Sequence, residues 1–317
     1  MTRIGTSSLD ILPLSLGGNV FGWTADRDTS FAILDAFTAA GGDFIDTADS
    51  YSAWVPGNSG GDSERVIGEW LASRRPEGVV VATKVSQHPE FKGLAAGNVR
   101  AAAEASLTRL GVDTIDLYYA HFDDETVPLE ETVGAFGALV ADGLVRYTAV
   151  SNYSADRIRE WIGIADGLGV ARPVAIQPHY NLVHRNDVEE HILPVANEFD
   201  LGLVPYFSLA KGFLTGKYRS TDAAGQSSPR AAAASTYATA QGLEIIDALE
   251  GIGAAHGVSI AATALAWLRA QDAVVAPLAS ASRVEQVADL LDGARVELTE
   301  DELAALTRVS EWTPAQV

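Results

Sequence analysis

The chain has 317 residues, of which 47% are hydrophobic and 20% are charged, with a formal net charge of −20 and no cysteine. Such a chain buries a substantial core, and its acidic charge without any basic run argues against nucleic-acid or membrane-surface partners. Without cysteine it has no disulfide, thiolate nucleophile or cysteine-ligated zinc, and we expect no signal peptide or membrane span, which favours the cytoplasm.

Short hydrophobic runs alternate with amphipathic stretches along almost the whole sequence, which is typical of parallel βα units. Arg3–Pro13 is expected to form a short hairpin at one end of the domain. The strands expected after it are, in chain order, Leu14–Gly18, Asp43–Asp46, Val79–Val85, Ile115–His121, Val145–Ser151, Val174–Gln177, Leu203–Phe207 and Val274–Leu278. Thr29–Ala40 and Val99–Leu110 are examples of the helices expected between them, and Leu298–Val309 is an expected extra C-terminal helix.

Eight such units predict one α/β domain over residues 1–317, a (β/α)8 TIM barrel with an N-terminal β-hairpin cap and an extra C-terminal helix. Arg219–Ala240, rich in Ser, Ala and Gly, is the long irregular connection in this scheme. Long connections in compact domains are functional lids or disordered segments, and the sequence leaves both open here.

Polar residues gather at the predicted strand ends, and barrel enzymes carry their chemistry at the C-terminal ends of the strands. The residues in such positions are Asp46, Lys84, His121, Asn152, Gln177, Tyr206 and Ser280. A single lysine after a strand is usually a solvated loop residue. The repeated coincidence over seven strand ends favours an active site.

Several motifs resemble those of the aldo-keto reductase family. Asp46-Thr-Ala-Asp-Ser-Tyr51, followed by Gly61-Asp-Ser-Glu64 and Ile67-Gly68, resembles the signature around the family's catalytic aspartate and tyrosine. Further matches in the family's order are Ala82-Thr-Lys84, Asp116-Leu-Tyr-Tyr-Ala-His121, Gly143-Leu-Val-Arg146, Val150-Ser-Asn152, Gln177-Pro-His-Tyr-Asn-Leu182, Pro205-Tyr-Phe-Ser-Leu209 and Gly212-Phe-Leu-Thr-Gly-Lys-Tyr218. The series covers essentially the whole chain, with one departure at His179, where the family more often has an acidic residue.

The chemistry that this resemblance implies is reduction of an aldehyde or ketone to an alcohol. Tyr51 is the expected proton donor, because a neighbouring cation such as Lys84 favours the phenolate and makes the phenol a better acid. A buried ammonium needs a partner, for which Asp46 is the candidate carboxylate. His121 is expected to hydrogen-bond the substrate oxygen, which completes the family's set of four catalytic residues.

Hydride transfer requires a nicotinamide cofactor, since no amino-acid side chain donates a hydride. A Rossmann site is not expected, because Gly251-Ile-Gly253 continues a helical stretch and lacks the third glycine. The resemblance instead assigns the nicotinamide to Ser151, Asn152, Gln177 and Tyr206, and the pyrophosphate to Ser208, Leu209, Lys211, Gly212 and Lys217.

The last βα turn is the expected adenosine end of the cofactor site, because helix N-termini attract anions. It contains Ser280, Ser282 and Arg283, and the helix that follows adds Gln286 and Asp289. A cation at this turn favours NADPH over NADH, with Arg283 reading the 2′-phosphate of NADPH.

The substrate is expected to be an apolar or ring-shaped carbonyl compound, because aromatic residues lie in the loops beside these motifs. The predicted pocket residues are Trp23, Trp54, Phe122 and Phe213. No metal site is expected, since the spacing of His179, His184 and His191 matches no ligand motif. Neither the individual substrate nor the oligomeric state can be predicted from the sequence.

Two alternatives remain open. One is a slow-turnover regulatory subunit resembling the cytoplasmic β subunits of potassium channels, although no cationic or exposed apolar extension points to a channel partner. The other is a phosphate-binding barrel isomerase or lyase, which would have no need for Tyr51 and Lys84 together.

Overall fold

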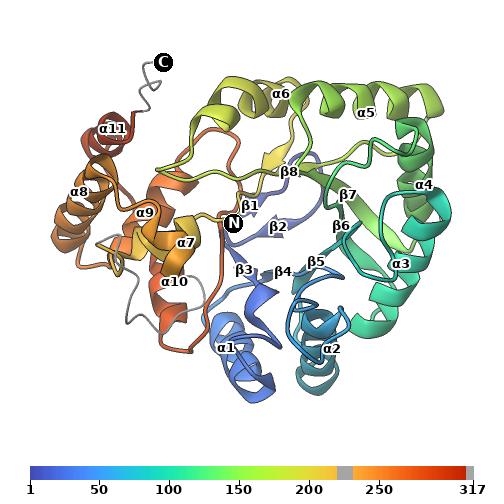
Figure 1. Ribbon diagram of the computed structural model, residues 1–317, viewed down its shortest axis with the longest axis horizontal. Coiled ribbons are helices and arrows are strands. Elements are labelled where there is room, and N and C mark those ends of the chain that lie inside the picture. The colour runs from blue at the N-terminus through green and yellow to red at the C-terminus, as the bar shows by residue number, and fades with distance from the viewer. Residues whose placement is uncertain (220–230, 312–317) are drawn as a thin grey trace.

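The computed structural model describes residues 1–219 and 231–311 and has a parallel β-barrel at its centre with helices around it (Figure 1). The strands pair in the order β10-β3-β4-β5-β6-β7-β8-β9. They are β3 (Ser15–Gly17), β4 (Phe44–Asp46), β5 (Val80–Val85), β6 (Ile115–Ala120), β7 (Val145–Ser151), β8 (Ala175–Gln177), β9 (Gly202–Leu203) and β10 (Leu278–Ala279).

The sheet closes into a barrel between β9 and the segment that precedes β10. The N–H of Leu203 donates to the carbonyl of Ala273 at 2.8 Å, and the N–H of Val275 donates to the carbonyl of Leu203 at 2.9 Å. The predicted (β/α)8 barrel is therefore confirmed.

The last two strands differ from the prediction. β9 ends at Leu203 instead of reaching Phe207, and β10 begins at Leu278, where the prediction ended. Pro205 and Pro277 lack the N–H that a sheet ladder needs, so each segment contributes isolated bonds in place of a continuous strand. The other predicted strands agree to within one residue at each end.

Helices cover the outside of the barrel. They are α1 (Arg27–Ala39), α2 (Asp62–Arg74), α3 (Ala96–Leu110), α4 (Leu129–Ala141), α5 (Ala155–Leu168), α6 (Leu193–Glu198), α7 (Ala231–Ser235), α8 (Ala240–His256), α9 (Ile260–Arg269), α10 (Gln286–Arg295) and α11 (Glu300–Val309). The described part of the chain also has short turns of helix at η1 (Gly18–Val20), η2 (Val188–Ile192) and η3 (Ala210–Thr215). Of the predicted irregular segment Arg219–Ala240, residues 220–230 lie outside the described residues.

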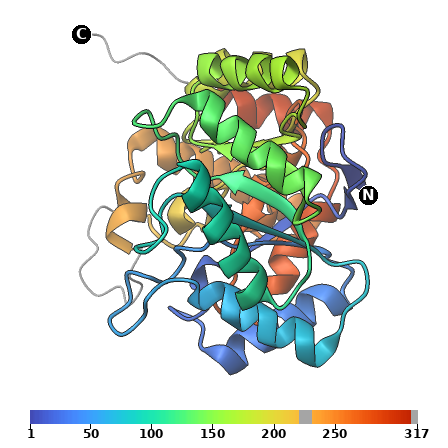
Figure 2. The ribbon, with the colours of Figure 1, turned by 90° about the vertical axis from the view of Figure 1, so that its right-hand side faces the viewer.

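The N-terminal hairpin and the extra C-terminal helix are both present. β1 (Thr2–Arg3) pairs antiparallel with β2 (Asp10–Ile11), and the buried side chains of Ile4 and Ile11 join the core inside the barrel. Figure 2 shows this hairpin at one end of the barrel and the loops after the strands at the other. Helix α11 begins with a capping box between Thr299 and Glu302. The hairpin thus covers one end of the barrel, and the carboxyl end stays open for a site.

Alternate residues of each strand face the inside and the outside of the barrel. In β6, Leu117 and Tyr119 belong to the core inside the barrel, whereas Tyr118 and Ala120 pack outward, with Tyr118 against Phe136 of α4. Of the helices within residues 1–219 and 231–311, none alone is long and apolar enough to cross a membrane, and α8 and α9 meet that criterion only as a pair bent by 95°.

Candidate active site

Strands β4 and β5 bring Asp46 and Lys84 together inside the barrel, where both side chains are fully buried. Lys84 Nζ donates to Asp46 Oδ1 at 2.5 Å and to the carbonyl oxygen of Thr47 at 2.7 Å. From β8, Gln177 Nε2 donates to Asp46 Oδ2 at 2.9 Å. Both carboxylate oxygens are therefore paired, as a buried charge requires.

The third proton of the ammonium points to Tyr51, because Lys84 Nζ lies 3.2 Å from Tyr51 Oη. Burial opposes charge on Lys84, but the attraction of Asp46 and of Tyr51 outweighs it and raises the pKa of Lys84. Lys84 is therefore a permanent cation at neutral pH. A cation in contact with a phenol oxygen favours release of the phenol proton.

His121 follows β6 and stands beside Tyr51, with their ring centroids 6.1 Å apart. Burial, and then the charge of Lys84, hold the pKa of His121 well below its ordinary value. Its Nδ1 has no hydrogen-bond partner within the described residues. A neutral imidazole at this position has one N–H to offer to a substrate oxygen.

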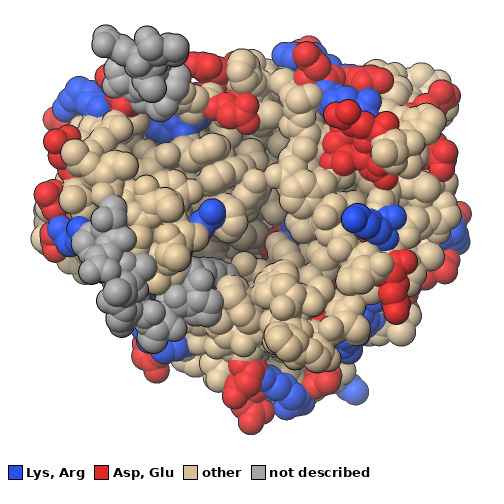
Figure 3. All heavy atoms as spheres, in the orientation of Figure 1, with Lys and Arg blue, Asp and Glu red and all other residues tan. Residues whose placement is uncertain are grey.

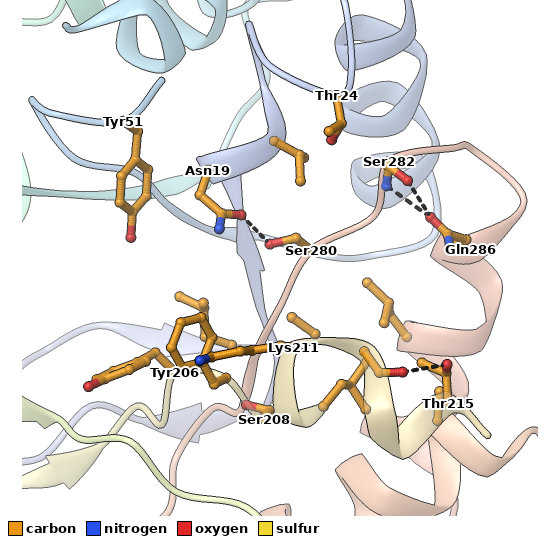
Figure 4. A pocket seen from close by; sticks show the side chains of 18 of the residues that line it. Asn19, Thr24, Tyr51, Tyr206, Ser208, Lys211, Thr215, Ser280, Ser282 and Gln286 are labelled. Atoms are coloured by element: carbon orange, nitrogen blue, oxygen red, sulfur yellow. Dashed lines mark hydrogen bonds between the residues drawn. The ribbon is translucent and has the colours of Figure 1, made fainter. Parts of the chain in front are cut away.

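Tyr51 and His121 both face a cavity of about 800 Å³ at the carboxyl end of the barrel. Figure 3 shows the mouth of this cavity as a hollow surrounded mainly by uncharged side chains. Figure 4 places Tyr51 at one end and Ser282 with Gln286 at the other. Every residue predicted from the sequence to bind the cofactor lines this one cavity: Ser151, Asn152, Gln177, Tyr206, Ser208, Leu209, Lys211, Gly212, Lys217, Ser280, Ser282, Arg283, Gln286 and Asp289.

At the end near Tyr51, Asn152 orients the ring of Tyr206. Asn152 has a left-handed backbone with φ of 57°, and its side-chain amide donates to the carbonyl oxygen of His121 at 2.8 Å. The hydroxyl of Tyr206 donates to Asn152 Oδ1 at 2.8 Å. Tyr206 is therefore held at the wall of the cavity by its hydroxyl.

In the middle of the cavity, η3 directs Lys211 and Phe213 to opposite sides. Lys211 and Gly212 have left-handed φ values of 58° and 100°, a conformation that is unstrained only for glycine. Figure 4 shows the side chain of Lys211 extending over the cavity. Phe213 is 0% exposed and packs in the core near Tyr237. The predicted place of Phe213 in the substrate pocket is therefore wrong.

At the far end of the cavity, a side chain of α10 accepts hydrogen bonds from backbone N–H groups of the turn before it. Gln286 Oε1 accepts from the N–H of Ser282 at 2.9 Å and from the N–H of Arg283 at 3.2 Å. Ser280 Oγ donates to Asn19 Oδ1 at 2.7 Å. Sequence reasoning missed Asn19, which lines the cavity in η1 directly after β3. The strand-end rule that selected the other residues would have found it.

Aromatic rings surround the mouth near Tyr51. Trp54 is 53% exposed and Phe122 is 41% exposed, and both of these predicted substrate-pocket residues line the cavity. Phe207, which the sequence analysis did not select, also lines it and is 38% exposed. Trp23 is not among the lining residues, and its ring meets that of Trp54 edge-on with the ring centroids 5.5 Å apart. Trp23 thus supports the mouth without forming its wall.

Asp49, in the same loop as Tyr51, is a buried acid outside the predicted catalytic set. Its side chain is fully buried, and neither oxygen has a hydrogen-bond partner within the described residues. Burial, and then the negative charge of Glu64, raise the pKa of Asp49 well above its ordinary value. Glu64 itself is paired, because Thr83 donates to it at 2.5 Å and Arg109 at 2.6 Å. Burial therefore favours the protonated, uncharged form of Asp49 in the folded protein.

Asp49→Asn is expected to stabilise the protein at neutral pH. In the unfolded chain Asp49 ionises above a pKa of about 3.9, whereas the folded protein keeps the proton up to a higher pH because the pKa of Asp49 is raised there. The stability of the wild type therefore falls as the pH rises from the unfolded pKa to the raised one. The amide of the variant cannot ionise, so its stability does not fall in this way. The difference in unfolding free energy between variant and wild type should therefore grow by about 1.4 kcal/mol per pH unit until the raised pKa of Asp49 is reached. Urea unfolding across this pH range measures the effect.

Glu64→Gln is the matched control, because it leaves Arg109 without its buried carboxylate partner and should lower the stability. Parallel pH profiles of stability for wild type and Asp49→Asn would contradict the raised pKa of Asp49.

Within residues 1–219 and 231–311, no group of three or more His, Asp or Glu side chains is arranged to hold a metal ion.

Comparison with known proteins agrees with this geometry. A model of the aldo/keto reductase family matches residues 13–311. A probable voltage-gated potassium channel subunit beta of Oryza sativa subsp. japonica is 32% identical, over 90% of this chain and 88% of the relative. The aldo-keto reductase str7 of Strobilurus tenacellus is 31% identical, over 98% and 89% respectively. Norsolorinic acid reductase B of Aspergillus parasiticus is 29% identical, over 97% and 83%. The chain therefore belongs to the aldo/keto reductase family.

Proposed function

We propose that this protein is an NADPH-dependent reductase that converts an aldehyde or ketone to an alcohol, with Tyr51 as the proton donor. The proposal rests chiefly on one contact, the 3.2 Å between the buried ammonium of Lys84 and the phenol oxygen of Tyr51. We also propose that residues 1–317 form a single domain, because the barrel strands run from β3 near the N-terminus to β10 near the C-terminus.

The cavity fits a dinucleotide in both its size and its cations. Its volume of about 800 Å³ lies within the range of known cofactor pockets. Lys211, Lys217 and Arg283 line it in a chain whose net charge is −20, so positive charge is concentrated where phosphates would bind. When bound, the reduced nicotinamide ring supplies the hydride. Tyr206, Asn152 and Gln177 would hold that ring beside Tyr51.

The protein groups supply the proton and stabilise the charge. Neutral His121 donates a hydrogen bond to the substrate oxygen and places it against Tyr51. The proton moves from Tyr51 Oη to this oxygen as negative charge develops there. Lys84 stabilises the phenolate that remains on Tyr51, and Asp46 keeps Lys84 in position. Each of these groups is already in place without substrate, so little reorganisation is needed.

The rings at the mouth favour an apolar, ring-shaped carbonyl substrate. Trp54, Phe122 and Phe207 are the exposed aromatic residues in the described ranges 1–219 and 231–311, and all three line this cavity. Flat aromatic faces bind flat apolar ligands, and exposed aromatic rings that gather at one cavity indicate a binding site for such a ligand. The name of the relative from Aspergillus parasiticus, norsolorinic acid reductase B, agrees with reductase chemistry.

The direct test is a panel of aldehydes and ketones assayed with NADPH and with NADH by the absorbance of the reduced cofactor. We expect consumption of NADPH with aromatic carbonyl compounds in preference to open-chain sugars. A panel without any absorbance change would overturn the proposal.

A slow-turnover regulatory role is the second candidate, because a relative at 32% identity is named as a potassium channel subunit. A single turnover separates the two roles. Oxidation of bound NADPH within seconds of adding an aldehyde supports a reductase, whereas oxidation over many minutes supports the regulatory role.

Arg283→Ala is expected to weaken NADPH binding by about one to two decades, the scale of one lost charge-assisted hydrogen bond to phosphate. NADH binding should change little, because NADH lacks the 2′-phosphate. The dissociation constants of both cofactors for wild type and variant measure the difference. Equal losses would show that Arg283 does not distinguish the two cofactors, and a wild-type preference for NADH would overturn the cofactor assignment.

A further inference from the structure

Three rings form a column that runs from the cavity to the protein surface. The rings of His179 and His184 stack with centroids 3.8 Å apart and planes at 11°. The ring of His179 also stacks against Tyr206, at 5.3 Å and 21°. Tyr206 lines the cavity, His179 is half-buried and His184 is exposed. The column therefore backs the face of Tyr206 that is turned away from the cavity.

Backbone hydrogen bonds build this column. The N–H of Tyr206 donates to the carbonyl of Pro178 at 2.9 Å, and a parallel bridge pairs His179 with Tyr206. Asn181 and His184 then exchange two backbone bonds of 3.1 and 3.0 Å, which turns the chain back so that His184 meets His179. The side chain of Asn181 completes the turn by donating to the carbonyl of Phe207 at 2.9 Å. The ring contacts thus follow from a defined turn after β8.

We propose that His179 and His184 are positioning residues that hold Tyr206 flat as the platform for the nicotinamide ring. This inference rests on the proposed cofactor. The hydroxyl of Tyr206 is fixed by Asn152, but one hydrogen bond at the hydroxyl leaves the ring free to tilt. Contact with His179 on the rear face removes that freedom, and His184 supports His179 in the same way. Reduced tilting lowers the ordering cost of binding a flat ring.

Protonation of both imidazoles would weaken the column, because two cations at 3.8 Å repel each other. The charged groups that face it are Lys211 on the side of His179 and Asp187 on the side of His184. Burial, then His184 and Lys211, lower the pKa of His179 to about 4. Burial also lowers the pKa of His184, against the attraction of Asp187. At neutral pH both rings are therefore uncharged.

The first test compares the affinity for NADP+ of His179→Ala and His179→Phe, by quenching of tryptophan fluorescence. We expect His179→Ala to weaken binding about threefold to tenfold, the scale of one lost aromatic contact, and His179→Phe to recover most of this loss. His191→Ala is the control, because the side chain of His191 is 60% exposed and lies outside the column. Binding by His179→Ala that equals binding by the control would overturn the inference.

The second test uses proton NMR titration of the histidines in the protein without cofactor, and it does not depend on the proposed function. His179 and His184 should both titrate below the ordinary value of about 6.5, and His184→Phe should raise the midpoint of His179 by removing a second positive charge. An unchanged midpoint would show that the two rings are not coupled. Failure of the wild type to bind either dinucleotide would instead overturn the proposed function.

Discussion

Tyr51→Phe is expected to lower kcat at least about a hundredfold, the usual scale for loss of a general acid, and to leave cofactor affinity almost unchanged. The substitution removes only the hydroxyl that Lys84 contacts at 3.2 Å, so the phenyl ring keeps its place beside His121 and Trp54. The loss should appear equally in kcat and in kcat/KM, because the missing proton is needed only in the transition state.

Steady-state kinetics with a carbonyl substrate from the panel, together with the dissociation constant of NADPH, measure both parts of this expectation. Tyr153→Phe is a suitable control, since this substitution also removes one phenolic hydroxyl. The ring of Tyr153 packs against Trp161, and Tyr153 does not line the cavity. Turnover that survives in Tyr51→Phe at the level of the control would exclude Tyr51 as the proton donor.

The strand ends explain why the sequence predicted so much of the candidate site. In a parallel barrel the carboxyl ends of all strands open onto one face, so residues far apart in sequence meet there without any knowledge of their contacts. Gln177 and Asp46 are 131 positions apart, yet they share a hydrogen bond because β8 and β4 belong to the same closed sheet. For these residues, a position at the end of a predicted strand was enough to predict that they meet at one end of the barrel.

Side-chain direction in irregular segments was not predictable in the same way. Phe213 lies two residues from Lys211, but two left-handed residues in η3 send Lys211 toward the cavity and Phe213 into the core. The stacking of His179 on His184 likewise depends on a reversal at Asn181 that has no strong motif. The two-residue period of strands and the 3.6-residue period of helices do not apply to such turns. The spacing of residues in the sequence therefore does not predict which side chains point toward the cavity.

Buried acids that lie behind the site were also missed. In the sequence, Asp49 and Glu64 stand out only as positions of the motif that resembles the aldo-keto reductase signature. Their burial results from how the loop after β4 packs over α2 and against Arg109 of α3, which is a property of the tertiary structure alone. A carboxyl group in a loop is usually solvated, so sequence reasoning assigns it no special pKa.

Lys84→Met is expected to abolish most activity and to lower the free energy of unfolding by about 3–5 kcal/mol, the cost of removing one partner of a buried ion pair. Methionine fills much of the same volume, so a cavity contributes little. The main penalty falls on Asp46, which would keep only the hydrogen bond from Gln177 at 2.9 Å and no positive charge. Activity falls as well, because Tyr51 loses the cation that favours release of its proton.

A double variant separates these two effects. Adding Asp46→Asn to Lys84→Met removes the stranded charge and should restore most of the stability, since two neutral side chains can be buried where one unpaired carboxylate cannot. Activity should stay low, because no cation remains beside Tyr51. Arg100→Met is the control for charge removal, since Arg100 pairs with Glu104 and Asp142 at the exposed surface and its loss should hardly change stability. Urea unfolding and turnover of all three variants give the result. A Lys84→Met protein that is as stable and as active as Arg100→Met would show that the buried pair neither holds the barrel together nor activates Tyr51.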